Sequence, residues 1–117
     1  YWFTFENYEY KKLFEIFKNF KYKNPNERLP AIYKTRLETN ILYLGKSKNC
    51  LWGRLITHLG YHQNRGYQGL MLSKWTKELN LKLTFNYCEF DPKMDEIISL
   101  YELKLSQQLK PLIGKHK

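Results

Sequence analysis

The spacing of apolar and polar positions predicts where the helices of this chain lie. Between Glu6 and Phe20, apolar residues recur at intervals of three and four, which predicts an amphipathic helix with lysines on its polar face. The same spacing predicts helices over about Cys50–Leu59, Leu70–Leu79 and Lys93–Leu109. The residues expected to be buried in these three helices are Leu51, Leu55, Ile56 and Leu59, then Met71, Trp75 and Leu79, and then Ile97, Ile98, Tyr101, Leu105 and Leu109.

Two neighbouring segments have the composition of β-strands. Leu29–Leu37 and Ile41–Gly45 contain β-branched and aromatic residues, and the polar residues 38–40 separate them, which predicts a β-hairpin. A turn of this length would place Tyr33 and Tyr43 opposite each other on one face. We therefore expect the rest of the chain to be organised around this hairpin.

One further strand is predicted outside the hairpin. Leu81–Phe90 alternates in hydrophobicity, which predicts a half-buried strand whose Leu81, Leu83, Phe85 and Tyr87 face inward. Tyr1–Phe5 is apolar and aromatic and is interpreted as a docking segment. The order is then helix, strand, strand, helix, helix, strand, helix. It is typical of an α+β fold in which helices flank a small three-stranded sheet, mixed or antiparallel.

Length and charge narrow the class of protein. With 117 residues the chain is expected to form one domain, in which residues 1–28 are a helical extension and residues 29–117 are the core. The formal net charge of +9 indicates a polyanionic partner, with nucleic acid first and an anionic membrane surface second. Aromatic residues make up 17% of the chain, and those interleaved with lysine suit base stacking as well as core packing.

The cysteines and the longest apolar runs bear on the environment of the protein. Cys50 and Cys88 are too few for a disulfide framework, so we expect a reducing, cytoplasmic setting. A zinc site that joined them to His58 and His62 would match no common ligand spacing, and two buried thiols with a surface histidine are expected instead. No apolar run reaches the roughly 18 residues of a membrane span, and no signal peptide is visible, so we expect no membrane association.

Polar residues suited to phosphate chemistry gather around the predicted hairpin. Lys46 follows its second strand, and Arg54 and His58 lie one helical turn apart, where both can point into one cleft. Glu102 lies at the border of the last apolar stripe, and a lone carboxylate suits one hydrated Mg²⁺ ion. Hydrolysis of a phosphodiester needs a base, cations that neutralise the phosphate and usually a metal. The candidate catalytic residues are Tyr33, Tyr43, Lys46, Arg54, His58 and Glu102.

The spacing of these residues resembles a known family. Ala31-Ile32-Tyr33 and Tyr43-Leu44-Gly45-Lys46, followed by Arg54, His58, Glu102 and Lys110-Pro111, resemble the motifs of the GIY-YIG nucleases. The resemblance covers about Leu29 to Lys115, most of the chain. It implies a small three-stranded sheet surrounded by helices, one divalent ion (Mg²⁺ or Mn²⁺), and cleavage of DNA, as in repair, homing or restriction.

The resemblance also implies a role for each matching residue. Tyr33 would help to activate the attacking water, and Tyr43 would line the same site. Lys46 would lower the pKa of a tyrosine or contact phosphate. Arg54 would neutralise the phosphate in the transition state, and Glu102 would bind the metal.

Three positions vary or depart from the family pattern. The family has histidine or tyrosine where this chain has His58, which could relay a proton. Its first motif usually begins with glycine, whereas this chain has the small residue Ala31. An asparagine commonly follows the C-terminal proline, and Gly114 stands there, which implies a low rate unless another polar side chain replaces the amide.

The sequence thus predicts a metal-dependent DNA endonuclease whose basic residues bind the phosphate backbone in a salt-sensitive way. Two alternatives stay open: a nucleic-acid-binding domain of the same fold with impaired catalysis, and a protein-interaction domain that docks through its aromatic N-terminal segment. The basic residues that we expect to contact DNA are Lys48, Arg65, Lys74 and Lys115.

Overall fold

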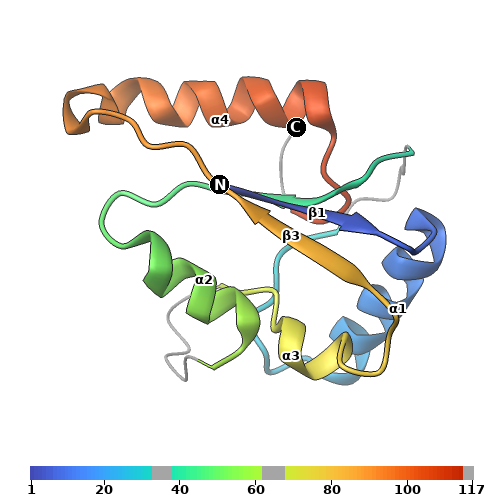
Figure 1. Cartoon of the computed structure of the whole chain (residues 1–117). Coiled ribbons are helices and arrows are strands. Elements are labelled where there is room, and N and C mark those ends of the chain that lie inside the picture. Colours follow the sequence, from blue (N-terminus) through green and yellow to red (C-terminus); the bar gives the residue numbers. More distant parts are fainter. Residues whose placement is uncertain (33–37, 62–67, 115–117) are drawn as a thin grey trace.

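The computed structural model describes residues 1–32, 38–61 and 68–114 (Figure 1). Within these residues the fold is α+β, as predicted, with one three-stranded antiparallel sheet and four α-helices. The elements in chain order are β1 (Trp2–Glu6), α1 (Tyr10–Lys23), β2 (Ile41–Leu44), α2 (Leu51–Leu59), α3 (Leu72–Trp75), β3 (Lys82–Asn86), the 3₁₀ turn η1 (Pro92–Met94) and α4 (Asp95–Leu109).

The central strand of the sheet is β1, at the start of the chain. The sheet has the order β2-β1-β3, and β1 is antiparallel to both neighbours. Phe3 of β1 lies opposite Tyr43 of β2 and Phe85 of β3, so these three side chains share one face. Because Phe3 and Phe5 alternate with Trp2 and Thr4, one side of β1 enters the core, where both phenylalanines are buried.

This arrangement corrects the interpretation of the N-terminal segment. Tyr1–Phe5 is not a docking segment, because its residues from Trp2 onward form a strand that is paired on both sides. Residues 1–28, which were expected to be an extension, supply this strand and the helix α1. The core residues of α1 are Leu13, Phe14 and Phe17.

The predicted hairpin is a second correction. Residues 29–32 contain no strand, and β2 pairs with β1. Residues 33–37 of the predicted first strand lie outside the described residues. The backbone carbonyls of residues 28–31 have other partners, in order the Gly69 N–H, Gln68 Nε2, Lys21 Nζ and the Gly114 N–H. Tyr33 lies outside the described residues, and the residue opposite Tyr43 on β1 is Phe3.

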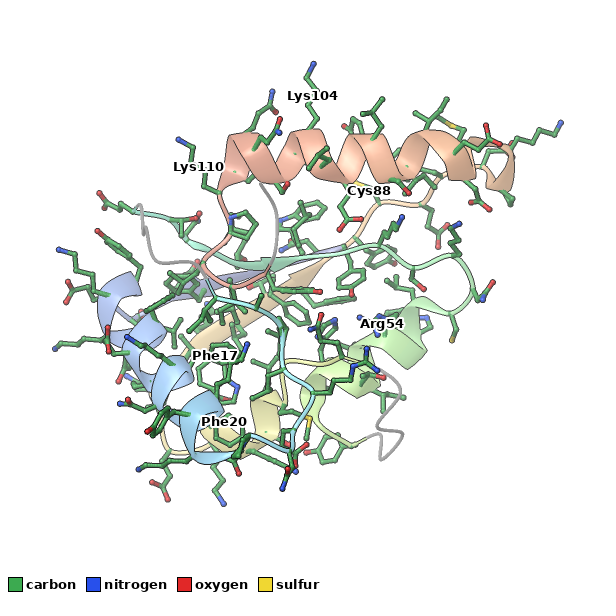
Figure 2. The ribbon with its side chains drawn as sticks, turned by 180° about the vertical axis from the view of Figure 1, so that it is seen from behind. Phe17, Phe20, Arg54, Cys88, Lys104 and Lys110 are labelled. Carbon is green, nitrogen blue, oxygen red and sulfur yellow. The ribbon has the colours of Figure 1, made fainter. Side chains whose placement is uncertain are left out.

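Helices cover the sheet unequally. α1, α2 and α3 lie on one side of it and α4 on the other (Figure 1). The core forms on the side of α1 and α3, where Phe17 (Figure 2) packs against Trp75 with 5.2 Å between ring centroids. Trp75 is buried as predicted, and its indole N–H donates to Leu70 O at 2.7 Å.

The apolar stripe of α4 does not enter the core, contrary to the prediction. Ile97 is 56% exposed and Tyr101 is 49% exposed, while Ser106 is the buried residue of this helix. The stripe of α2 is also less buried than expected, because Thr57 and His58 hold the buried positions and Ile56 is 46% exposed. Both helices therefore present apolar surface that the sheet does not cover.

Candidate functional site

The buried centre of the candidate site is His58 on α2. Its exposure is 0%, and its ring lies 4.8 Å from that of Tyr43 and 5.5 Å from that of Tyr1, centroid to centroid. The backbone N–H of Leu70 donates to His58 Nδ1 at 3.1 Å. A ring nitrogen that accepts a hydrogen bond carries no proton, so this network places the proton of the neutral imidazole on Nε2.

Burial keeps this imidazole neutral. It lowers the pKa of His58 to about 3, and the nearby positive charge of Arg54 acts in the same direction. The Nε2–H can then donate to Tyr1 Oη, which lies 2.8 Å away. Since one nitrogen accepts from the backbone and the other donates to Tyr1, His58 positions the tyrosine and has no free nitrogen for the proton relay implied by the resemblance.

This burial predicts a pH dependence of stability. Below the ordinary histidine pKa of 6.5, the unfolded chain binds a proton at position 58 that the folded chain excludes until about pH 3. The free energy of unfolding should therefore fall as the pH falls through this window, by up to about 1.4 kcal/mol per pH unit from this group. Urea unfolding at several pH values between 6.5 and 5 measures the slope.

The matched control is His58→Gln, whose side-chain amide can accept from Leu70 and donate to Tyr1 without titrating. The slope of stability against pH should be smaller in this variant. Equal slopes in the two proteins would show that His58 does not stay neutral in the fold.

Tyr1 is the site residue that the sequence interpretation missed. Its hydroxyl oxygen accepts from His58 and also from Arg54 Nε, which lies 3.4 Å away. Arg54 is held in turn by a bond of 3.3 Å from Nη2 to Gln68 O. Because both neighbours of Tyr1 Oη are donors, the hydroxyl hydrogen must point away from them.

Gly45 makes room for this tyrosine. The Tyr1 backbone nitrogen donates to Gly45 O, and the Gly45 N–H donates to Tyr1 O, both at 2.9 Å. A Cβ atom at Gly45 would lie 2.5 Å from Tyr1 Oη and 2.7 Å from its Cζ. The glycine after Tyr43-Leu44 is therefore needed for the close approach of the phenol.

Burial sets the protonation of both tyrosines in the site. It raises the pKa of Tyr1 and of Tyr43, while the guanidinium of Arg54 opposes the rise and the negative charge of Glu102 adds to it. Both phenols are thus protonated at neutral pH. Glu102 and Arg54 act on the same hydroxyl groups with opposite sign, although the two residues lie on α4 and α2.

A cavity of about 500 Å³ lies between α4 and the segment that joins β2 to α2. Tyr1, Lys46, Lys48 and Glu102 line it. Lys46 Nζ donates to Ser99 Oγ, which lies one turn before Glu102 on α4, so the two walls are joined at this point. The cavity brings the predicted lysine and glutamate to Tyr1, whose hydroxyl bonds to Arg54 and His58 on α2.

The carboxylates of this cavity suit a hard cation. Glu102 lines it together with Glu89 and Asp95. In the part of the chain that the structure describes, no three His, Cys, Asp or Glu side chains form a metal-binding group. Mg²⁺, however, is commonly held by one or two carboxylates, with waters and substrate phosphate oxygens as the other ligands. The carboxylates that line the cavity, Glu102 among them, are of the type that such an ion uses.

The expected DNA contacts are distributed unequally. Lys48 is exposed and lines the cavity. Lys74 on α3 is not among the cavity residues, and its Nζ forms an ion pair with Glu27 Oε1 at 3.2 Å. Tyr33, Arg65 and Lys115 lie outside the described residues.

Both thiols are free and exposed, which corrects the expectation of buried cysteines. Cys50 Sγ accepts from the Gly53 N–H at 3.3 Å and caps the start of α2. Cys88 lines the cavity. His58 is buried, and His62 lies outside the described residues.

Gly114 has a structural role that the sequence did not suggest. It is buried, its φ is +121°, and its N–H donates to Ala31 O at 2.9 Å. Side chains of L residues rarely adopt this conformation, so an asparagine here would be strained. An asparagine at this position would therefore be expected to cost folding stability.

Comparisons with known proteins add no assignment. The chain matches no protein-family model, no curated protein and no solved structure. Among the described residues, no helix has the length and apolarity that a membrane span requires. The function is therefore inferred from the site itself.

Proposed function

We propose that this chain is a metal-dependent endonuclease of the GIY-YIG type that hydrolyses DNA phosphodiester bonds. The observation that carries the proposal is the position of Tyr1, whose hydroxyl accepts from Arg54 and His58 and which also lines the cavity that contains Lys46 and Glu102. The order and spacing of Tyr43, Gly45, Arg54, His58 and Glu102 along the chain support it.

Each residue has a role that follows from its contacts. The Arg54 guanidinium supplies donors for a phosphate whose charge grows in the transition state. Lys46 and Lys48 contribute positive charge at the cavity, where a DNA backbone would enter. Glu102 would hold one Mg²⁺ or Mn²⁺ ion, which when bound supplies Lewis-acid stabilisation of the phosphate oxygens.

Tyr1 takes the role that the resemblance gives to Tyr33. Two N–H donors face its oxygen, and they would stabilise negative charge there when its proton is removed. Burial opposes this ionisation and raises the pKa of the phenol. We therefore infer that Tyr1 activates the attacking water and that the cleavage rate rises with pH above neutrality.

The exchange Tyr1→Phe tests this role. It removes the oxygen and keeps the ring, so cleavage should slow by about 10²-fold, in line with typical losses of a general base. The rise of the rate with pH should disappear as well. Single-turnover nicking across a range of pH values measures both effects.

Tyr22→Phe is the control, because this tyrosine on α1 is 87% exposed and lies outside the cavity lining. Tyr33→Phe is the competing variant. A large loss in it, with a wild-type rate in Tyr1→Phe, would return the role to Tyr33 and contradict our assignment.

Incubation with supercoiled plasmid tests the function as a whole. Nicking is expected with Mg²⁺ or Mn²⁺ and not with a chelator. The absence of nicking with any metal would overturn the enzyme proposal, and a salt-sensitive shift of DNA without nicking would favour a binding domain. The protein-interaction alternative has lost its stated basis, because the N-terminal aromatic segment is the central strand β1.

A further inference from the structure

Two large aromatic side chains next to the candidate site face solvent. Trp52, in the first turn of α2, is 56% exposed, and Tyr87, directly after β3, is 47% exposed. Their ring centroids lie 5.9 Å apart with 71° between the planes. A flat ligand stacked on one ring would therefore contact the edge of the other. Tyr87 was expected to face inward, and its exposure corrects that prediction.

A row of rings connects this exposed pair to the site. The ring centroid of Trp52 lies 6.3 Å from that of Phe85, and the Phe85 centroid lies 5.7 Å from that of Tyr1. The ring centroid of Tyr1 in turn lies 5.5 Å from that of His58. A ligand on Trp52 and Tyr87 would thus be separated by Phe85 from Tyr1, whose hydroxyl accepts from Arg54 and His58.

The charge near these rings selects one kind of ligand. Lys48 is exposed and lines the cavity. The cavity is also lined by Leu51 and Cys88, which are the chain neighbours of Trp52 and Tyr87. The chain as a whole carries a formal charge of +9. Aromatic faces beside cations are the features with which proteins bind single-stranded nucleic acid, because bases stack on the rings while phosphates meet the positive charge.

We propose that Trp52 and Tyr87 stack an unpaired nucleobase next to the phosphate at Arg54, so that the substrate is single-stranded or locally unpaired nucleic acid. In a regular duplex the bases are stacked on each other and cannot lie on a protein ring without being extruded, which costs energy. The inference rests on the proposed nuclease function for the phosphate at Arg54. The stacking surface itself can be tested without catalysis.

The experiment compares a single-stranded oligonucleotide with a duplex of the same length, in chelator and at fixed salt. Wild-type protein should bind the single strand more tightly. Trp52→Ala should weaken this binding by about tenfold or more, which is the effect of losing one base–aromatic stack, and should leave duplex binding nearly unchanged. The single strand should also quench part of the tryptophan fluorescence of the wild-type protein, and this quenching should be lost in Trp52→Ala.

Three further variants make the result specific. Tyr22→Ala removes another exposed aromatic ring, on α1, and should bind like wild type. Trp52→Phe keeps a ring and should retain most of the affinity, whereas Tyr87→Leu should lose part of it. These variants also decide the question if Trp52→Ala should fail to fold, which thermal unfolding would reveal.

The outcomes separate this inference from the nuclease proposal. Wild-type protein that nicks DNA but binds both oligonucleotides equally, or Trp52 and Tyr87 variants with wild-type affinity, would overturn the stacking surface and leave the nuclease standing. Wild-type protein that binds neither oligonucleotide and cuts no DNA would overturn both. Tighter binding of the single strand that depends on Trp52, without any nicking, would support the surface and overturn the nuclease.

Discussion

Glu102→Gln should abolish metal-dependent nicking and leave the affinity for DNA unchanged or slightly raised. The amide has almost the same shape as the carboxylate but lacks the charge that holds a divalent ion. The loss of a negative charge from a cavity lined by Lys46 and Lys48 also removes repulsion of the phosphate backbone. Nicking with Mg²⁺ or Mn²⁺ and a binding titration in chelator measure the two effects separately.

Glu96→Gln is the matched control. Glu96 is an exposed residue on the same helix, and it is not among the cavity residues, so the variant should cut at the wild-type rate. Retained nicking in Glu102→Gln would sink the assignment of Glu102 as the metal ligand. Glu89 and Asp95, which line the same cavity, would then be the carboxylates to examine.

The elements predicted with the best agreement are those whose signals are local. The helical spacing around Leu13 and Phe17 predicts α1 to within a few residues, and the alternation around Leu83 predicts β3. The pairing of the strands is not a local property. Leu29–Leu37 looked like the partner of β2 because a short turn would join them, yet β1 pairs with β2 across a chain separation of about forty residues.

The aromatic alternation of β1 was present in the sequence, but Tyr1–Phe5 was interpreted as a docking segment. Tyr1, Phe3 and Phe5 recur with period two, which is the pattern of a strand with one buried face. The carbonyls of residues 28–31 accept from Lys21 of α1 and from Gln68, Gly69 and Gly114, so these four acceptors are not available to β2. Partners so distant in the chain cannot be read from composition.

In the candidate site, too, the local relation between residues was predicted and the contacts between distant segments were not. Arg54 and His58 were expected on one helical edge, and the structure brings both to the Tyr1 hydroxyl. The tyrosine itself lies 57 residues from His58 in the sequence, and no spacing rule connects them. The Leu70 N–H, which determines which nitrogen of His58 carries the proton, comes from a third segment and was equally out of reach.

The stripe of α4 illustrates a different reason for failure. Its period shows that Ile98, Tyr101 and Leu105 share one face of the helix, and all three line the cavity. The spacing of apolar residues determines which of them share a face of the helix, but it does not determine whether another element covers that face. Here the stripe borders the cavity beside the sheet, so apolar residues lie next to Glu102 instead of inside a core.

Arg54→Ala should lower the cleavage rate by about 10² to 10³-fold, the usual loss for one electrostatic donor to a transition state, and weaken DNA binding only slightly. The guanidinium bonds to Tyr1 Oη and to Gln68 O, which fixes its position before any phosphate arrives. Such a fixed donor acts most strongly where charge develops during the reaction. Single-turnover rates and affinities in chelator give the two losses separately.

Two controls separate charge from geometry in this result. Arg54→Lys keeps a positive charge but not the planar group that bonds to both Tyr1 and Gln68, so it should recover little of the rate. Lys48→Ala removes an exposed cation that lines the cavity, and its losses in affinity and in rate should match. Matched losses in Arg54→Ala as well would mean that Arg54 only holds the substrate. Full recovery in Arg54→Lys would mean that the bonds to Tyr1 and Gln68 are unimportant for catalysis.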